Sequence, residues 1–281
     1  MVLGYGHPAM RGGRIGGPLA RSGDGLFTLG SLLLACRPPL DGTVEEQVLP
    51  SLATGDQYLV RTLTPSTPRP DGGWPVAVVL DGDWSFDLVA RLAESLADEG
   101  AVPPLLVVAV GYADGNHRAQ DYTPTAVSDL EGSGGGPAFL DFVEQELLPW
   151  EIAERGGSVD PTDRVLLGWS LGGLCGVVAL FDDRPFGGFV VSSPSLWYDD
   201  GVAFESEATW TPGPDTRVFA SMGAWEDSTF MNAPFAAFVD RMEARTDVDF
   251  ASQLVPSGGH SRSVPSAYEA GLRHVFHAEN P

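Results

Sequence analysis

The sequence predicts an α/β fold with one mostly parallel sheet and helices on both faces. Short apolar runs rich in branched residues alternate with segments whose apolar residues recur at helical spacing. This alternation is typical of parallel strands that are connected by helices crossing over the sheet. A Gly-x-Ser-x-Gly pentapeptide lies between one such run and an apolar helical segment. In a fold of this kind, the functional loops are expected at the carboxyl ends of the strands.

Strands are expected where the apolar runs occur. The segments 76–80 and 105–110 are continuous apolar runs, which indicates strands that are buried on both faces. The segment 58–63 follows a Thr-Gly-Asp turn signal. In chain order, the expected strands are 58–63, 76–80, 105–110, 164–168, 189–191, 217–220 and 250–255.

Helices are expected between these strands. The segment 86–99 places Phe86, Val89, Leu92 and Leu96 on one side, as an amphipathic helix requires. The other segments show the same spacing or, after the pentapeptide, an almost wholly apolar run. In chain order, the expected helices are 86–99, 139–150, 171–181, 235–245 and 268–277.

The length and composition favour one globular catalytic domain. The chain has 281 residues, of which 43% are hydrophobic and 10% aromatic. A chain of this length buries about three quarters of its unfolded surface, so its core needs no disulfide or metal. No internal repeat is visible. We expect a single α/β domain over residues 51–281 and an N-terminal extension of unknown role over residues 1–50.

The charge of the chain excludes two classes of partner. There are 38 acidic and 16 basic residues, a formal net charge of −22, and every basic residue is arginine. Nucleic acid and anionic membrane surfaces both attract positive charge, so neither is an expected partner. No apolar run reaches 18 residues, so no transmembrane segment is expected. The two cysteines form no CxxC pair, and neither a metal site nor a cofactor is expected.

The N-terminal extension allows two interpretations. An apolar decamer, 26–35, follows three arginines and precedes Cys36, which resembles a lipoprotein signal whose lipidated residue is Cys36. The alternative is a short strand, or an upstream extension read from the wrong start codon. A cytoplasmic location is the expectation, and a lipid-anchored or exported protein is the alternative.

The pentapeptide from Gly168 to Gly172 predicts the nucleophile. A nucleophile elbow is a sharp turn between a strand and a helix, and its glycines remove side chains that would clash in the turn. The segment from 164 to 168 is apolar, and the segment after Leu171 is an apolar helix. Ser170 is therefore the expected nucleophile. The alternative is a tight glycine turn with an exposed serine.

A serine hydroxyl needs a base, and in this type of site the chain order is serine, acid, histidine. His260 follows the last expected strand in a Pro/Gly-containing loop, so it is the expected base. Glu226 and Asp227 follow the strand at 217–220, and either could orient the histidine. Glu226 is preferred and Asp227 is the alternative acid. A third possibility is a Ser–His dyad, with both carboxylates on the surface.

The negative charge that develops on an ester oxygen needs two backbone N–H donors. Leu171 follows the nucleophile directly, so its N–H is one expected donor of this oxyanion hole. The other comes from a loop after an earlier strand, and the Asp83 N–H is the candidate. A carboxylate close to an oxyanion would be unfavourable. The Asp83 side chain must therefore point away.

Several segments together resemble the esterase D-like family of α/β-hydrolases, which includes enterochelin esterases. They occur in the family's order, and the resemblance runs from about residue 51 to the C-terminus, about four fifths of the chain. The segments are 51–58, 79–82, 118–124, 168–173, 192–197 and 258–260. The resemblance implies an α/β-hydrolase fold and supports Ser170, His260 and Glu226 as catalytic residues. It also supports Leu171 and Asp83 as oxyanion donors.

The same resemblance implies a set of substrate-binding residues. Arg118 is implied to lie near the pocket, where it meets an anionic or catecholate substrate or else pairs with Asp121 to hold its loop. Trp84, Trp169 and Trp197 would line an aromatic pocket, or else pack in the core. The family commonly has histidine at the position of Trp169, so the shape of the pocket is expected to differ here.

The predicted function is that of a serine hydrolase that cleaves carboxylic esters of siderophore-type or other aryl or acyl compounds through an acyl-enzyme. The expected partner is a small-molecule ester. One alternative is an acyltransferase that uses the same serine, and another is a non-catalytic binding module on the same fold. The sequence leaves the oligomeric state open.

Overall fold

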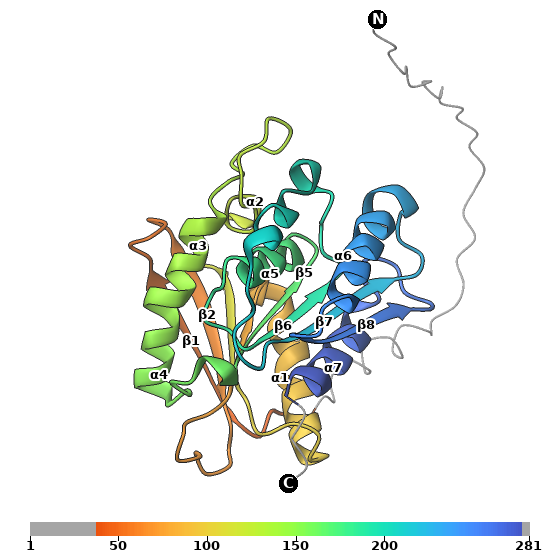
Figure 1. Cartoon of the computed structure of the whole chain (residues 1–281). Helices are drawn as coiled ribbons and strands as arrows, with labels where there is room; N and C mark the ends of the chain where they lie inside the picture. Colours follow the sequence, from red (N-terminus) through yellow and green to blue (C-terminus); the bar gives the residue numbers. More distant parts are fainter. Residues whose placement is uncertain (1–37, 277–281) are drawn as a thin grey trace, which may run out of the picture. The chain divides into compact units, whose positions relative to one another are not determined.

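A computed structural model describes residues 38–276, which contain one eight-stranded sheet of order β1-β2-β4-β3-β5-β6-β7-β8 (Figure 1). β1 pairs with β2 and β2 with β4 in antiparallel fashion, whereas the remaining neighbours are parallel. The strands are β1 Thr43–Pro50, β2 Gln57–Thr64, β3 Val76–Val79, β4 Leu106–Tyr112, β5 Arg164–Trp169, β6 Gly188–Ser192, β7 Arg217–Gly223 and β8 Asp249–Val255. The predicted mostly parallel sheet is confirmed.

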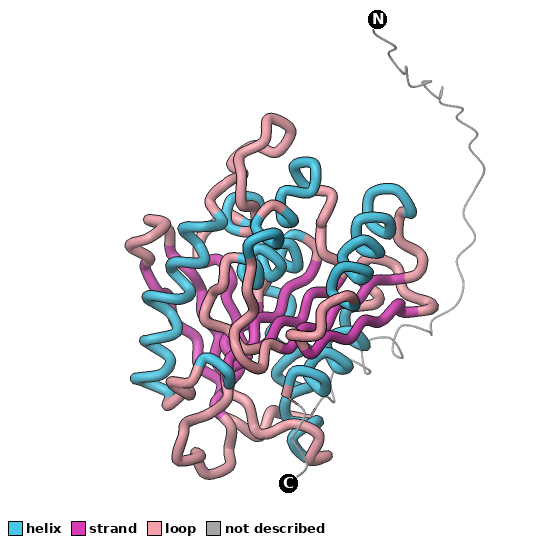
Figure 2. Tube along the Cα trace, viewed as in Figure 1, coloured by secondary structure: helices cyan, strands magenta, loops and turns pink. Residues whose placement is uncertain are grey.

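Helices flank the sheet on both faces, and Figure 2 shows them on either side of the strands. The helices are α1 Gly82–Asp98, α2 Arg118–Asp121, α3 Gly136–Phe142, α4 Leu148–Arg155, α5 Leu171–Phe181, α6 Ala233–Glu243 and α7 Val264–Val275. A π-helical turn, η1 Val143–Leu147, joins α3 to α4 without a break. Shorter turns are η2 Pro161–Asp163, η3 Tyr198–Phe204, η4 Ser206–Thr209 and η5 Ser228–Asn232.

The sheet separates two apolar cores, because successive side chains of a strand point to opposite faces. In β3, Val76 and Val78 pack into the core beneath α3, α5 and α6, whereas Ala77 and Val79 pack into the core beneath α1 and α7. All four side chains are completely buried. This double burial explains why the strand is a continuous apolar run in the sequence.

Strand β1 is the main element that the apolar pattern did not predict. Four of its eight residues are polar and six are exposed, and Leu49 is the β1 residue that packs against the core. β1 is an edge strand, and it is held by its ladder with β2 and by an ion pair of 2.8 Å between Glu46 Oε1 and Arg61 Nε. The catalytic domain was expected to begin at residue 51, and the structure adds residues 43–50 to its sheet. Cys36 lies outside the described residues.

The ends of several helices also differ from the expected bounds. The helix expected at 139–150 extends from Gly136 to Arg155, and the helix expected from 268 begins at Val264.

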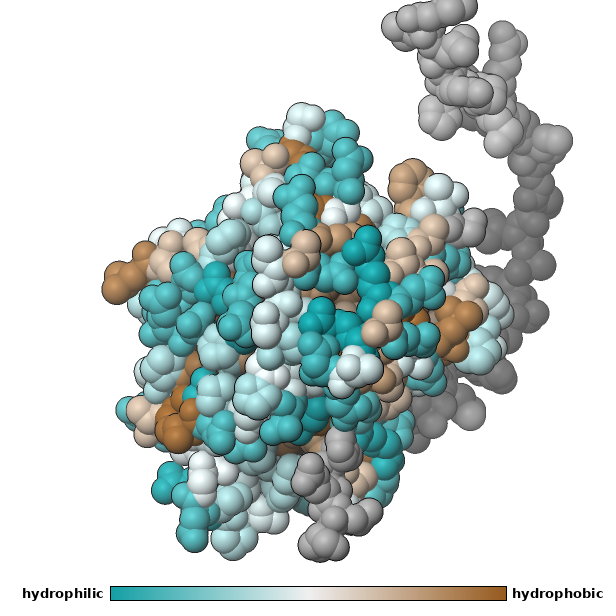
Figure 3. Space-filling view, viewed as in Figure 1, coloured by the Kyte–Doolittle hydropathy of each residue, from teal (hydrophilic) through white to brown (hydrophobic). Residues whose placement is uncertain are grey.

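None of the helices within residues 38–276 has the length and apolarity that crossing a membrane requires. The face shown in Figure 3 is mainly hydrophilic, with apolar side chains in separate patches.

Candidate active site

The predicted nucleophile lies on a strained turn between β5 and α5. Ser170 has φ 60° and ψ −118°, a conformation that non-glycine residues rarely adopt. A side chain at Gly168 would place its Cβ 2.1 Å from the Gly172 carbonyl oxygen, so only glycine fits there. The Ser170 N–H donates to the Ser192 carbonyl at 3.0 Å, which holds the turn against the end of β6. This geometry is that of a nucleophile elbow.

The structure brings Ser170, His260 and Glu226 together in a line. His260 Nε2 is 3.0 Å from Ser170 Oγ, and His260 Nδ1 is 2.6 Å from Glu226 Oε2. These residues come from the loops after β5, β8 and β7, which end at the same edge of the parallel sheet. A base with the serine on one ring nitrogen and a carboxylate on the other has the geometry of a catalytic triad.

The second oxygen of Glu226 is fixed by two further donors. Glu226 Oε1 accepts hydrogen bonds from Ser193 Oγ at 2.6 Å and from the Gly223 N–H at 2.8 Å. Burial acts to raise the pKa of Glu226, but the hydrogen bonds from His260, Ser193 and Gly223 outweigh burial and lower the pKa below its ordinary 4.5. The carboxylate is therefore ionised at neutral pH and suited to orient His260.

Asp227, the alternative acid, lies elsewhere. Its carboxylate accepts hydrogen bonds of 2.8 Å from the N–H groups of Thr229 and Phe230, so it caps η5. These bonds lower the pKa of Asp227. The geometry therefore places Glu226, and not Asp227, against His260.

Ser193 is a residue of this site that the sequence reasoning did not assign. It is completely buried and has φ 44°, which turns its hydroxyl from the end of β6 toward the loop after β7. The Ser-Ser-Pro sequence directly after a buried strand was the available signal. That sequence alone could not assign Ser193 to the site, because its hydrogen-bond partner, Glu226, lies on another loop.

The two expected oxyanion donors both lie in first turns of helices, where backbone N–H groups have no partner within the helix. Leu171 begins α5, and Asp83 is the second residue of α1. Asp83 Oδ2 accepts a 3.3 Å hydrogen bond from the Tyr112 N–H, so the carboxylate points toward β4. This is the orientation that an oxyanion donor at this position requires. The oxyanion hole itself stays a prediction.

Arg118, expected near the pocket, pairs with Asp81 and not with Asp121. Its Nε and one Nη donate to the Asp81 carboxylate at 2.6 and 3.1 Å, and the same Nη donates to the Trp169 carbonyl at 3.0 Å. Asp121 is completely buried and accepts from Tyr58 Oη at 3.1 Å. Burial raises the pKa of Asp121 to about 6.

The three expected pocket tryptophans take different positions. Trp169 Nε1 donates to the His260 carbonyl at 2.7 Å, and the Trp169 ring packs edge-on against Trp84 at 5.1 Å. Trp84 and Trp197 are 45% and 44% exposed, so neither is a core residue. Trp197 contacts Phe230, which is itself exposed, as is Trp225 beside Glu226. The sequence reasoning did not assign Trp225 or Phe230 to the site.

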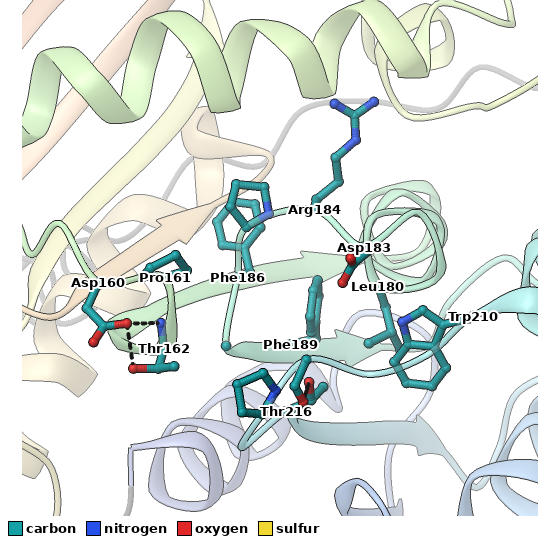
Figure 4. Close-up of a pocket in the computed structure, with 14 residues that line it drawn as sticks. Asp160, Pro161, Thr162, Leu180, Asp183, Arg184, Phe186, Phe189, Trp210 and Thr216 are labelled. Carbon is teal, nitrogen blue, oxygen red and sulfur yellow. Dashed lines mark hydrogen bonds between the residues drawn. The ribbon is translucent and has the colours of Figure 1, made fainter.

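A cavity of about 390 Å³ lies at the other ends of β5, β6 and β7 (Figure 4). Phe186, Phe189 and Trp210 line it, and so do Asp160 and Thr162, whose N–H and hydroxyl donate to the Asp160 carboxylate. It contains none of the predicted site residues. Among the described residues, no three His, Cys, Asp or Glu side chains are grouped to hold a metal ion.

The fold and the Ser170–His260–Glu226 geometry define an α/β-hydrolase with the arrangement of a serine hydrolase. The chain belongs to the family described as "Putative esterase", whose model matches residues 51–273. The family and the fold expected from the sequence are thereby confirmed.

Several characterised proteins are similar to this chain. It is 31% identical to the ferri-bacillibactin esterase BesA of Bacillus subtilis over 84% of this chain and 91% of that protein. It is 36% identical to the apo-salmochelin esterase of Escherichia coli O6:H1 over 50% of this chain and 47% of that protein, so the match spans about half the length of that relative. The crystal structure of the BES protein from Bacillus cereus has a TM-score of 0.78 and 26% identity, covering 86% of this chain and 99% of that one.

Proposed function

We propose that this protein is a carboxylic ester hydrolase that works through an acyl-enzyme on Ser170. The 3.0 Å contact between His260 Nε2 and Ser170 Oγ, on a strained elbow, carries the proposal. Ser170 Oγ attacks the ester carbonyl carbon while His260 Nε2 takes the hydroxyl proton. Glu226, 2.6 Å from Nδ1, stabilises the protonated ring that forms.

The remaining steps use the same groups. The N–H groups of Leu171 and Asp83 are proposed to hold the oxyanion of the tetrahedral intermediate, which lowers its free energy. His260 returns its proton to the alcohol oxygen as the ester C–O bond breaks. A water molecule then attacks the acyl-enzyme, again giving a proton to His260, and the acid leaves as Ser170 Oγ regains that proton.

We further propose that the substrate is a siderophore-type ester. The relatives whose names record an activity include the apo-salmochelin esterase, the ferri-bacillibactin esterase and a triacetylfusarinine C esterase of Aspergillus fumigatus, the last 29% identical over 61% of this chain and 65% of that protein. Exposed rings follow the carboxyl ends of three strands: Trp84 in the first turn of α1 after β3, Trp197 after β6, and Trp225 and Phe230 after β7. They would pack against the flat groups of such an ester.

A panel of esters tests both parts of this proposal. Catecholate triesters, hydroxamate siderophore esters, feruloyl esters and short acyl esters would be compared by kcat/KM, with Ser170→Ala as the blank. The proposal expects hydrolysis by the wild-type protein and a preference for one siderophore class. Hydrolysis of short acyl esters alone would overturn the substrate assignment. Transfer of the acyl group mainly to added alcohols would make the protein an acyltransferase instead.

A further inference from the structure

Arg118 joins two turns that carry the proposed oxyanion donors. On one side, its guanidinium forms two hydrogen bonds with Asp81, at 2.6 and 3.1 Å. On the other side, it donates at 3.0 Å to the Trp169 carbonyl, the residue directly before Ser170. Asp81 and Trp169 are 88 positions apart in the chain, so no local backbone interaction could set the distance between them.

The turn at Asp81 has a strained backbone. Asp81 has φ 56°, a left-handed conformation that costs free energy in a non-glycine residue. It caps α1, whose second residue is Asp83, and it is only 3% exposed. Its N–H donates to Tyr122 Oη at 2.8 Å. The position of the Asp83 N–H therefore depends on what holds Asp81.

The carboxylate of Asp81 also lies close to the elbow. A Cβ at Gly172 would be 3.2 Å from Asp81 Oδ2, which shows how tightly this carboxylate packs against the first turn of α5. Burial raises the pKa of Asp81, and the hydrogen bonds from Arg118 act in the opposite direction. A buried carboxylate that lost its arginine would be protonated or drawn toward water, and either change would move the turn.

We propose that Arg118, paired with Asp81, is a positioning residue that fixes the distance between the two backbone donors of the oxyanion hole. It acts through the Asp81 turn and the Trp169 carbonyl, and its charge is balanced by Asp81 and so is not available to an anionic substrate. This inference rests on the proposed ester hydrolysis. It assigns to Arg118 a role that differs from the substrate contact expected from the sequence.

Three variants test the proposal on a pair of p-nitrophenyl esters that differ only in a carboxylate on the acyl group. Arg118→Met and Arg118→Lys remove the bidentate contact, and Asp81→Asn removes its partner. Arg184→Met is the matched control, because Arg184 is similarly buried and pairs with Asp141 at 2.6 Å and Glu144 at 3.0 Å away from the site. Melting temperature, kcat and KM would be measured for each.

The expected result is a fall in kcat of about 10- to 100-fold for Arg118→Met, equal for the two esters and with little change in KM, because donors displaced by about 1 Å lose this much. Arg118→Lys should recover little, since an ammonium cannot make the bidentate contact. Asp81→Asn should lose kcat as well. In a fourth variant, Arg118→Ala, added guanidinium should partly restore the activity, because the cation can occupy the space that the arginine side chain leaves.

Three results would overturn the proposal. A loss confined to the anionic ester would make Arg118 a substrate ligand, and in that case Asp81→Asn should improve binding of that ester by freeing the arginine. An unchanged kcat in Arg118→Met would show that Arg118 does not position the oxyanion donors. If Arg184→Met lost as much kcat as Arg118→Met, and its melting temperature fell by the same amount, the loss would reflect general destabilisation of the protein.

The test separates this inference from the proposed function. If the wild-type protein hydrolysed none of the esters, the proposed function would be refuted, but the role of the Arg118–Asp81 pair would need a different readout. The rate at which a fluorophosphonate labels Ser170 then replaces kcat, because the phosphonyl oxygen occupies the same oxyanion hole. An unchanged labelling rate in Arg118→Met would contradict the positioning role by itself.

Discussion

Ser193 Oγ and Glu226 Oε1 are joined by a 2.6 Å hydrogen bond between residues 33 positions apart. The two residues follow β6 and β7, which are neighbours in the sheet. The carboxylate that contacts His260 Nδ1 is thus held from the loop after the adjacent strand as well as from its own loop. Both the hydroxyl and the Gly223 N–H contact the oxygen that His260 does not use.

Ser193→Ala should lower kcat by about 10- to 100-fold, because a hydrogen bond to a charged group contributes about 1.5–3 kcal/mol. Without the Ser193 hydroxyl, the Glu226 carboxylate is expected to be less ionised and less well oriented toward His260. Steady-state kinetics on one activated ester would measure the loss. Ser221→Ala is the matched control, since the buried Ser221 Oγ has no hydrogen-bond partner in the described part of the chain and its removal should leave kcat unchanged. Equal behaviour of the two variants would contradict this role for Ser193.

Glu226→Gln and Asp227→Asn separate the two acids that the sequence left open. Glu226→Gln should reduce kcat by about 10²- to 10⁴-fold, because the neutral amide cannot stabilise a protonated His260. Asp227→Asn should have almost no effect, since asparagine also caps a helix well. Rates would be compared at one pH with active-site titration of both variants. Small and equal losses would favour a Ser–His dyad.

Ser170→Ala should abolish ester hydrolysis and labelling by a fluorophosphonate. The expected loss is at least about 10³-fold, since the oxyanion hole alone retains only residual catalysis. The melting temperature should change little, because the small hydroxyl makes no core contact. Ser66→Ala, a substitution on an exposed loop, is the control that should keep full activity. Retained hydrolysis in Ser170→Ala would refute the nucleophile.

Trp197→Ala should weaken the binding of aryl esters more than that of acetate esters. Stacking of aromatic groups contributes about 0.5–1.5 kcal/mol, so KM for an aryl ester should rise up to about tenfold at nearly constant kcat. Trp150→Ala is the control, because Trp150 packs under Arg155 in α4, away from the exposed rings of the site. A parallel rise in KM for both ester classes would show that Trp197 does not recognise the aromatic group.

The elbow and the histidine that lies beside Ser170 could be predicted because their signals are local. Gly168 and Gly172 surround Ser170 in five consecutive positions, and His260 is the histidine in the loop after the last strand. The apolar runs likewise predicted the buried strands, since burial on both faces removes polar residues. β1 lacks this signal because it is an edge strand that pairs only with β2 and most of its residues are exposed to solvent.

The partners of charged groups could not be predicted in the same way. Arg118 lies three positions from Asp121, yet it pairs with Asp81, which is 37 positions away. The two residues pair because their loops meet in the folded structure, and the spacing of residues in the sequence does not indicate this contact. The same holds for Ser193 and Glu226. Contacts between loops that meet only at the edge of the sheet require the sheet order, which the sequence pattern left open.

Glu151 should make stability depend on pH. It is completely buried in α4, where one carboxylate oxygen accepts from Thr62 Oγ1 at 2.9 Å and the other has no hydrogen-bond partner within residues 38–276. Burial raises the pKa of Glu151 from 4.5 to about 7. Between these values the folded state holds a proton that the unfolded state releases, so this contribution to stability is lost as the pH rises from about 4.5 to 7.

Glu151→Gln removes this titration and should therefore stabilise the protein at pH 8 but not at pH 5. The gain at pH 8 should reach at most about 3 kcal/mol, since each unit of pKa difference corresponds to about 1.4 kcal/mol. Urea unfolding at both pH values would measure it, with Glu154→Gln on the exposed side of α4 as the control. A constant difference between Glu151→Gln and the wild-type protein across this range would show that Glu151 is ionised in the fold, because then no proton would be released on unfolding.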